Sequence, residues 1–167
     1  IMKKKSLILA ALLFVASTTG AFAFGIGLQA NANAGSVFAG GPAVTFKVDS
    51  APLIFAVNYY AGNDIQTFGV TGDYWIMNDK ITSINSAALN WFWGVGFFAN
   101  TTFEKGEDMA LIGGIRVPLG LNMFLGKGGA FEPFLQVAPS FGVRFVPSLA
   151  AENLFFPISL GFRVWFK

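Results

Sequence analysis

Residues 157–166 alternate strictly between two kinds of side chain. One parity holds Ile158, Leu160, Phe162, Val164 and Phe166, and the other holds Pro157, Ser159, Gly161, Arg163 and Trp165. Successive side chains of a β-strand point to opposite faces, so this pattern predicts a strand with one apolar face. Any fold for this chain must give that face something apolar to contact.

The same alternation recurs along the chain, and turn residues separate its segments. We predict strands at 24–33, 43–48, 53–60, 66–76, 89–98, 110–121, 132–141 (with a possible extension to 145) and 157–166. Two of these segments contain a proline, Pro118 and Pro139, which removes a ladder donor. We therefore expect bulges or strand ends at both prolines.

The beginning of the chain has the order of a secretory signal peptide. A basic stretch at 3–5 precedes an apolar run at 7–16, and Ala21-Phe22-Ala23 supplies an A-x-A cleavage site. We predict a signal peptide at 1–23 and one barrel domain at 24–167, with an uncleaved N-terminal anchor as the alternative. Cleavage would remove three of the 11 basic residues. The mature chain would then have eight basic and nine acidic residues, a net charge of −1.

The length of the mature chain fits a barrel that crosses a membrane. A transmembrane strand needs about 9–11 residues, so eight strands take roughly 80 residues and leave room for short connections. The sequence therefore predicts an all-β fold, an eight-stranded antiparallel up-and-down transmembrane β-barrel. A transmembrane helix over residues 81–103 is an alternative because this stretch carries no charge. It is the weaker one, since the stretch is rich in polar residues, glycine and aromatics.

The charged residues distinguish a membrane barrel from a soluble one. Six charges fall inside predicted strands, all on the parity opposite the bulky apolar residues: Lys47, Asp73, Arg116, Glu132, Arg144 and Arg163. A cation facing lipid at the midplane costs roughly 2–4 kcal/mol. We predict an ion-pair network of these six residues inside the barrel, in which Arg116 and Arg163 pair with Asp73 or Glu132.

Large aromatic residues give a second prediction. If the N-terminus lies in the periplasm, Tyr74, Trp91 and Phe166 face outward at the same boundary, as an interfacial aromatic girdle would. Large residues of the inward parity are expected to fill the lumen instead. Four of these are Trp75, Phe98, Phe134 and Trp165.

Composition excludes several kinds of chemistry. The chain has no Cys and no His, which excludes disulfides, thiolate or His-ligated metal sites and a Ser-His-Asp triad. We expect no metal, no cofactor and no enzymatic activity, since Asp73 and Glu132 lack a motif spacing. The basic residues are scattered, so we expect no nucleic-acid partner.

The apolar series that ends at Phe166 resembles the C-terminal signature of bacterial outer-membrane barrels, although Lys167 follows the aromatic residue here. The whole of 24–166 resembles the small OmpA/OmpX/OmpW-type eight-stranded barrels. The run at 114–120 is also similar to spirochaetal members of that group. The resemblance implies outer-membrane localisation, lipid contact and recognition by the periplasmic barrel-insertion machinery.

Three functions remain open at this point. The first is a non-enzymatic outer-membrane barrel with a filled interior, which supports the envelope or presents outer loops to host or environmental ligands. The second is a narrow channel for small apolar or anionic solutes. The third is a soluble periplasmic lipid-binding barrel, which would turn its apolar parity inward.

Overall fold

The computed structural model describes residues 23–34, 40–85 and 87–166. The described strands are β1 (Phe24–Ala34), β2 (Gly41–Val48), β3 (Leu53–Ala61), β4 (Ile65–Ile84), β5 (Ala87–Glu104), β6 (Ala110–Arg116), β7 (Leu119–Phe124), β8 (Phe131–Val137), β9 (Ser140–Val146), β10 (Ala150–Ala151) and β11 (Phe156–Phe166). A 3₁₀ turn, η1, covers Lys127–Gly129. Most of the predicted signal peptide lies outside the described residues, so its cleavage stays a prediction.

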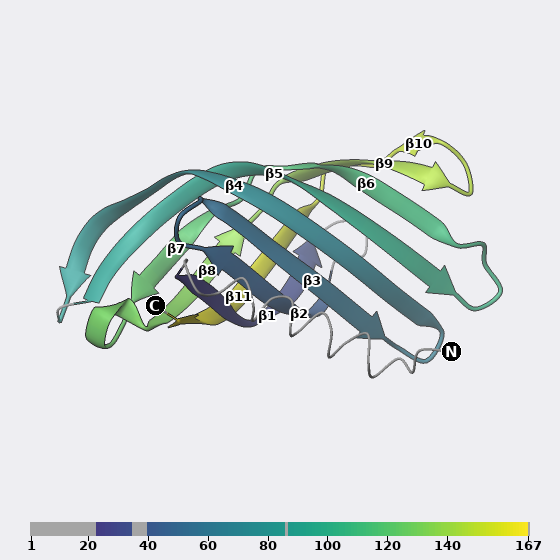
Figure 1. Ribbon diagram of the computed structural model, residues 1–167. Helices are drawn as coiled ribbons and strands as arrows, with labels where there is room; N and C mark the ends of the chain where they lie inside the picture. Colours follow the sequence, from purple (N-terminus) through teal and green to yellow (C-terminus); the bar gives the residue numbers. More distant parts are fainter. Residues whose placement is uncertain (1–22, 35–39, 86, 167) are drawn as a thin grey trace.

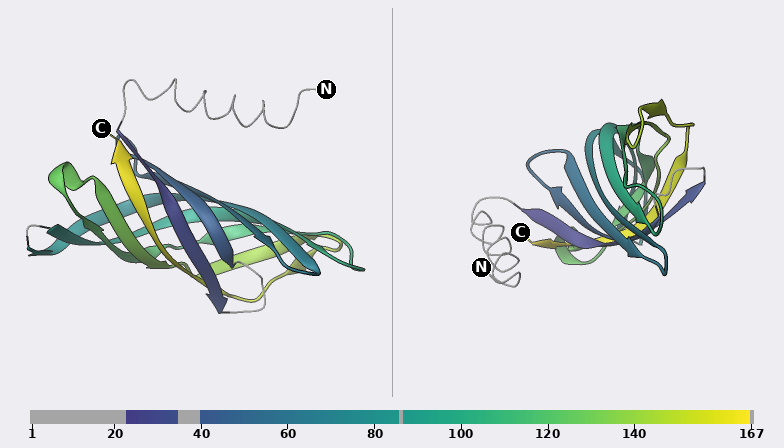
Figure 2. Two further views of the ribbon diagram at one scale, coloured as in Figure 1. Left: turned by 90° about the horizontal axis from the view of Figure 1, so that it is seen from below. Right: turned by 90° about the vertical axis from the view of Figure 1, so that its right-hand side faces the viewer.

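The strands pair into one closed antiparallel sheet (Figures 1 and 2). Neighbours in the chain pair in order from β1 to β5, and β11 returns to pair with β1. β5 pairs with both β6 and β7, while β9 and β8 continue the wall towards β11. β6 with β7, and β8 with β9, each form one interrupted span. The predicted eight-stranded barrel is therefore confirmed.

The two interruptions lie at the prolines, as predicted. Pro118 separates β6 from β7, and Pro139 separates β8 from β9. The neighbouring chain still bonds there, because Gly94 N–H donates to the Pro118 carbonyl at 2.8 Å and Val117 N–H donates to the Pro139 carbonyl at 2.9 Å. Each proline removes one donor from the ladder but leaves its carbonyl available as an acceptor.

Two strands are longer than expected. β4 runs to Ile84 and β5 starts at Ala87. Their hairpin therefore includes residues 77–84 and 87–88, which were predicted to belong to a connection between strands. After Tyr74, which pairs with Leu53, β4 has no further ladder partner on that side among the described residues. Figure 1 shows this hairpin extending beyond β3. The cross-strand ladder with β5 supports the extension, which mixes polar and apolar residues.

The segment at 148–153, which lies between the last two predicted strands, contains the short strand β10. Its two residues pair with Arg144 and Val143 of β9. In the described part of the chain no helix is long and apolar enough to cross a membrane.

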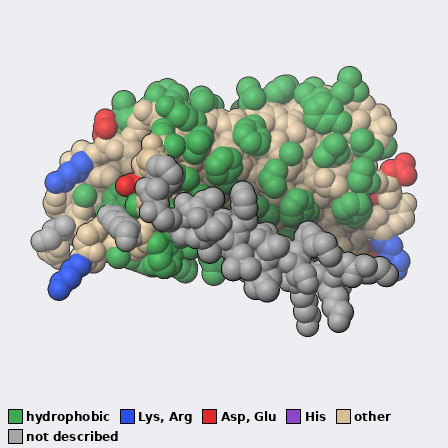
Figure 3. Space-filling model, in the orientation of Figure 1, with side chains coloured by type: hydrophobic (Ala, Val, Ile, Leu, Met, Phe, Trp, Pro, Cys, Tyr) green, Lys and Arg blue, Asp and Glu red, His purple; other side chains and the backbone are tan. Residues whose placement is uncertain are grey.

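The bulky side chains face outward and the ionic groups face inward. Along β11, Phe162 and Val164 are 38% and 39% exposed, whereas Arg163 between them is 1% exposed. On the face shown in Figure 3, apolar side chains cover the middle of the barrel, and charged side chains lie towards its two ends. The prediction that the bulky apolar parity faces outward and the other parity faces inward is confirmed.

Candidate functional site

The candidate site is the barrel interior, which divides into two parts. We call the half that carries Phe24 and Phe166 the terminal half, and the opposite half the loop half. Glu132 lies in the terminal half, and Arg116, which pairs with Asp73, borders the cavity of the loop half. Groups of three or more His, Cys, Asp or Glu side chains that could hold a metal are absent from the described residues.

Glu132 is the centre of the terminal half and is fully buried. Its Oε1 lies 2.9 Å from Lys47 Nζ and 3.3 Å from Arg163 Nη1. Asn122 Nδ2 donates to Oε1 at 2.6 Å, and Trp165 Nε1 donates to Oε2 at 2.9 Å. A buried carboxylate needs this many partners, because pairing alone rarely offsets the cost of removing a charge from water.

Aromatic rings enclose the two cations. Lys47 Nζ lies 4.1 Å from the centroid of the Trp75 ring, and the Arg163 guanidinium lies 4.0 Å from that of Phe134. Trp75 in turn stacks on Phe92 with ring centroids 3.7 Å apart. Cations gain from the face of an aromatic ring when water is excluded. The rings therefore fill the lumen and also stabilise its charges.

Glycines on the inward face of β1 make room for these contacts. Gly25 pairs with Lys47 on one side and with Trp165 on the other. Gly27 lies in the same way between Thr45 and Arg163, and Arg163 Nε donates across it to Thr45 Oγ1 at 3.2 Å. Because Gly25 and Gly27 have no side chains, residues of β2 and β11 can contact each other across the inner face of β1.

The second ion pair uses the same arrangement on another strand. Asp73 of β4 and Arg116 of β6 both pair in register with Gly96 of β5. Arg116 Nε lies 3.2 Å from Asp73 Oδ1, and both side chains are almost fully buried. A Cβ on Gly96 would lie 2.1 Å from Asp73 Oδ1, so this position has to be glycine for the pair to form.

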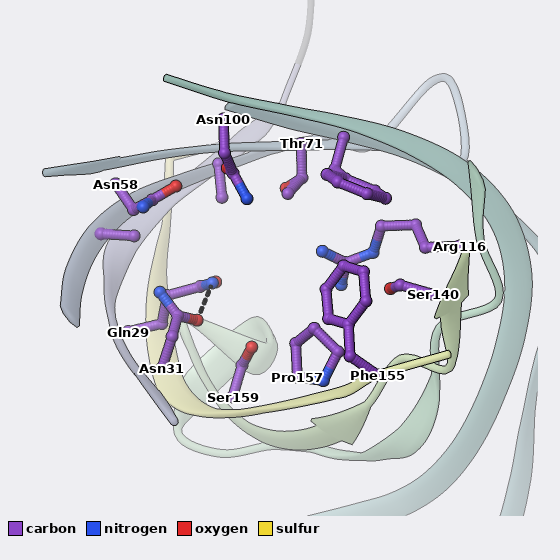
Figure 4. Close-up of a pocket in the computed structure, with 13 residues that line it drawn as sticks. Gln29, Asn31, Asn58, Thr71, Asn100, Arg116, Ser140, Phe155, Pro157 and Ser159 are labelled. Atoms are coloured by element: carbon purple, nitrogen blue, oxygen red, sulfur yellow. Dashed lines mark hydrogen bonds between the residues drawn. The ribbon is translucent and has the colours of Figure 1, made fainter. Parts of the chain in front are cut away.

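Arg116 borders a small polar cavity in the loop half (Figure 4). Its volume is about 30 Å³, which is room for about two water molecules. Its polar lining includes Gln29, Asn31, Asn58, Thr71, Asn100, Ser140 and Ser159. Gln29 Nε2 donates to Asn31 Oδ1 at 2.8 Å, the bond drawn in Figure 4.

Phe155 closes this half of the interior from the side of the last connection. It is 1% exposed and packs edge-on against Phe98 with ring centroids 5.3 Å apart. Its backbone exchanges two hydrogen bonds with Ser140, at 2.9 and 3.1 Å. Phe155 precedes the last predicted strand, so it was not predicted to be an interior residue. Phe155 shares its parity with Pro157 and Ser159, and this shared parity could have indicated that it faces the interior.

Arg144 lies apart from the other five residues of the predicted network. Its Nη2 lies 2.7 Å from Glu152 Oε1, and the Arg144 side chain is 40% exposed. Arg144 therefore pairs with a residue outside the predicted network, and its side chain is partly exposed. It stands near the loop end of β9, where β10 folds back and brings Glu152 within reach. The structure brings Lys47, Arg163 and Glu132 together, and separately joins Asp73 to Arg116.

The expected lumen-filling aromatics and the expected girdle lie on opposite faces. Trp75, Phe98, Phe134 and Trp165 are 3%, 4%, 3% and 7% exposed. The girdle residues Tyr74, Trp91 and Phe166 are 50%, 41% and 50% exposed and face outward. Their common position at a membrane boundary stays a prediction.

No protein-family model matches the chain, and no curated protein matches it. Among solved structures, the chain is similar to Neisserial surface protein A, NspA, with 16% identity, a TM-score of 0.47 and coverage of 87% of this chain and 97% of that one. It is also similar to Ail, the attachment invasion locus protein of Yersinia pestis, with 11% identity, a TM-score of 0.42 and coverage of 87% and 97%. These likenesses are too distant to transfer a role.

Proposed function

We propose that the chain is a non-enzymatic integral barrel of the bacterial outer membrane with a filled interior. Its role is to support the envelope or to present its loop end to partners outside the cell. The observation that carries the proposal is the exposure along β11, where Phe162 and Val164 face out and Arg163 faces in. Hydrocarbon is the environment that stabilises such an exterior, and a closed barrel satisfies its backbone hydrogen bonds without water.

The interior argues against the soluble alternative. A lipid-binding barrel of the lipocalin kind keeps an apolar cavity for its ligand. Here the lumen holds Glu132, Arg163 and Asp73, all buried, among rings and amides. The apolar exterior would also be an unusually large exposed patch for a protein surrounded by water.

The filling also argues against a conducting pore. The Glu132 cluster and its rings lie inside the lumen of the terminal half, and the loop-half cavity measures only about 30 Å³. We therefore expect no conductance steps when the folded protein is added to planar lipid bilayers. Regular steps from a well-folded sample would favour the narrow channel for small apolar or anionic solutes.

The membrane assignment is tested by partitioning and by access. The folded protein is expected to enter the detergent phase, to show strand-type circular dichroism and to migrate differently in gels before and after heating. Protease added to intact cells is expected to cut only at the loop end, for example in the charged turn at 105–109. A protein that stays in the aqueous phase after removal of its signal peptide would contradict the proposal.

A further inference from the structure

A cavity of about 380 Å³ opens at the terminal end, where β4 leaves β3. The last contacts between these strands are the pairing of Leu53 with Tyr74 and the hydrogen bond from Trp75 N–H to the Pro52 carbonyl at 2.8 Å. Beyond them β4 continues to Ile84 without a described partner on that side. The edge of β4 is therefore unpaired beyond the β2–β3 turn, which leaves an interruption in the rim of the barrel.

The cavity passes through this interruption. Its lining combines the inward residues Lys47, Trp75 and Trp165 with the outward residues Tyr74 and Ile76. The inward three are at most 7% exposed, whereas Tyr74 and Ile76 are 50% and 49% exposed. One pocket thus connects the ionic cluster of the lumen with the apolar exterior of the barrel. Its size falls in the range that accommodates small-molecule ligands.

The charges at the inner end favour an anion. Lys47 and Arg163 share one carboxylate, Glu132, while Asp73 is already paired with Arg116. The ammonium of Lys47 has three donors, of which one is directed at Glu132. Asp49 also lines the cavity, but its side chain is exposed, so water screens its charge.

A further polar group supports an anionic ligand at this place. Trp75 lines the cavity and is 3% exposed, and its Nε1 donor has no hydrogen-bond partner among the described residues. Buried polar groups are normally hydrogen-bonded, so an unpaired donor that lines a cavity marks a place where an accepting ligand group fits.

We propose that this opening binds a single-chain amphiphile with an anionic head group. The head, a carboxylate or a phosphate, accepts hydrogen bonds from Lys47 Nζ. The acyl chain passes the rings of Trp75 and Trp165 and leaves between Tyr74 and Ile76 into the bilayer. The inference rests on the membrane placement proposed above, because only lipid outside the barrel gives the chain an apolar path.

The test uses the folded protein in lipid discs. Lauric acid and a monoacylglycerol phosphate carry the two head groups, and dodecanol is the neutral control. Binding is followed through tryptophan emission, with a fatty acid brominated next to its carboxylate as the quencher, because Trp75 and Trp165 line the cavity. We expect both the wild-type protein and Lys47→Arg to bind at least one anionic amphiphile, and dodecanol to bind more weakly. The tighter anion identifies the head group.

Lys47→Met is expected to weaken binding roughly tenfold or more, since a hydrogen bond to a charged group is lost. In this variant the negative charge of Glu132 is still balanced by the positive charge of Arg163. The barrel should therefore stay folded and keep its heat-modifiable gel mobility. Lys80→Met removes a charge from the exposed part of the same β4 strand and should leave binding unchanged. Ala51→Phe, in the β2–β3 turn, fills the cavity without touching the ion pairs and should also abolish binding.

Equal binding by Lys47→Met and the wild-type protein would overturn the inference, as would equal affinity for dodecanol and lauric acid. Inserted protein that binds neither anion would overturn it as well, while leaving the membrane assignment intact. Failure of the protein to enter the discs would instead contradict the proposed function.

Discussion

In the terminal half of the barrel one carboxylate, Glu132, meets two cations and two neutral donors, all enclosed by rings. In the loop half Asp73 meets one cation, Arg116, next to amides and a cavity of about 30 Å³. The first arrangement surrounds its carboxylate with four partners, although one of them, Lys47, also borders the terminal cavity of about 380 Å³. The second relies on one charged partner and on a polar lining with room for water. Charge can thus be buried in one barrel by many direct partners or by one partner beside a polar lining.

The comparison predicts that the largest loss of stability follows from Glu132→Gln. The variant leaves Lys47 and Arg163 buried without a carboxylate. We expect the free energy of unfolding to fall by about 3–5 kcal/mol, the usual range when one member of a buried pair is removed. Urea unfolding in lipid discs, followed by tryptophan emission, measures it. A loss below about 1 kcal/mol, the size of an exposed pair, would show that Glu132 is not the centre of this half.

A smaller loss is expected for Asp73→Asn. The neutral side chain leaves the Arg116 guanidinium without its charged partner, but the neighbouring cavity offers that cation a polar environment. We expect a decrease of about 1–3 kcal/mol in the same unfolding measurement. A decrease as large as that of Glu132→Gln would remove the distinction between the two halves.

The smallest effect is expected at the loop end. Arg144 and Glu152 form a partly exposed pair at 2.7 Å that holds the last connection against β9. Glu152→Gln should change the free energy of unfolding by less than about 1 kcal/mol, because water screens the pair. Proteolysis of the segment at 147–154 should quicken, which limited digestion followed by mass spectrometry would detect. An unchanged digestion rate would argue that the pair does not hold this segment.

The direction of the side chains could be predicted from the sequence because alternation depends only on local strand geometry. The strand interruptions at Pro118 and Pro139 followed from the missing donors. The choice of partners was harder: Glu132 meets Lys47 across the chain closure, and that depends on which strands become neighbours and in what register. The added length of β4 was hidden because polar residues such as Asn78, Asp79 and Lys80 break the apolar alternation there. Arg144 was misplaced because parity says nothing about height along the barrel.

Pro118 and Pro139 stand almost opposite each other on adjoining spans, since Arg116 pairs with Ser140 and Leu119 pairs with Val137. At that level two donors are missing from one stretch of the wall, between the ionic cluster and the amide-lined cavity. The two adjoining spans therefore lack donors at the same height, and the proline carbonyls keep bonding to the neighbouring chain there.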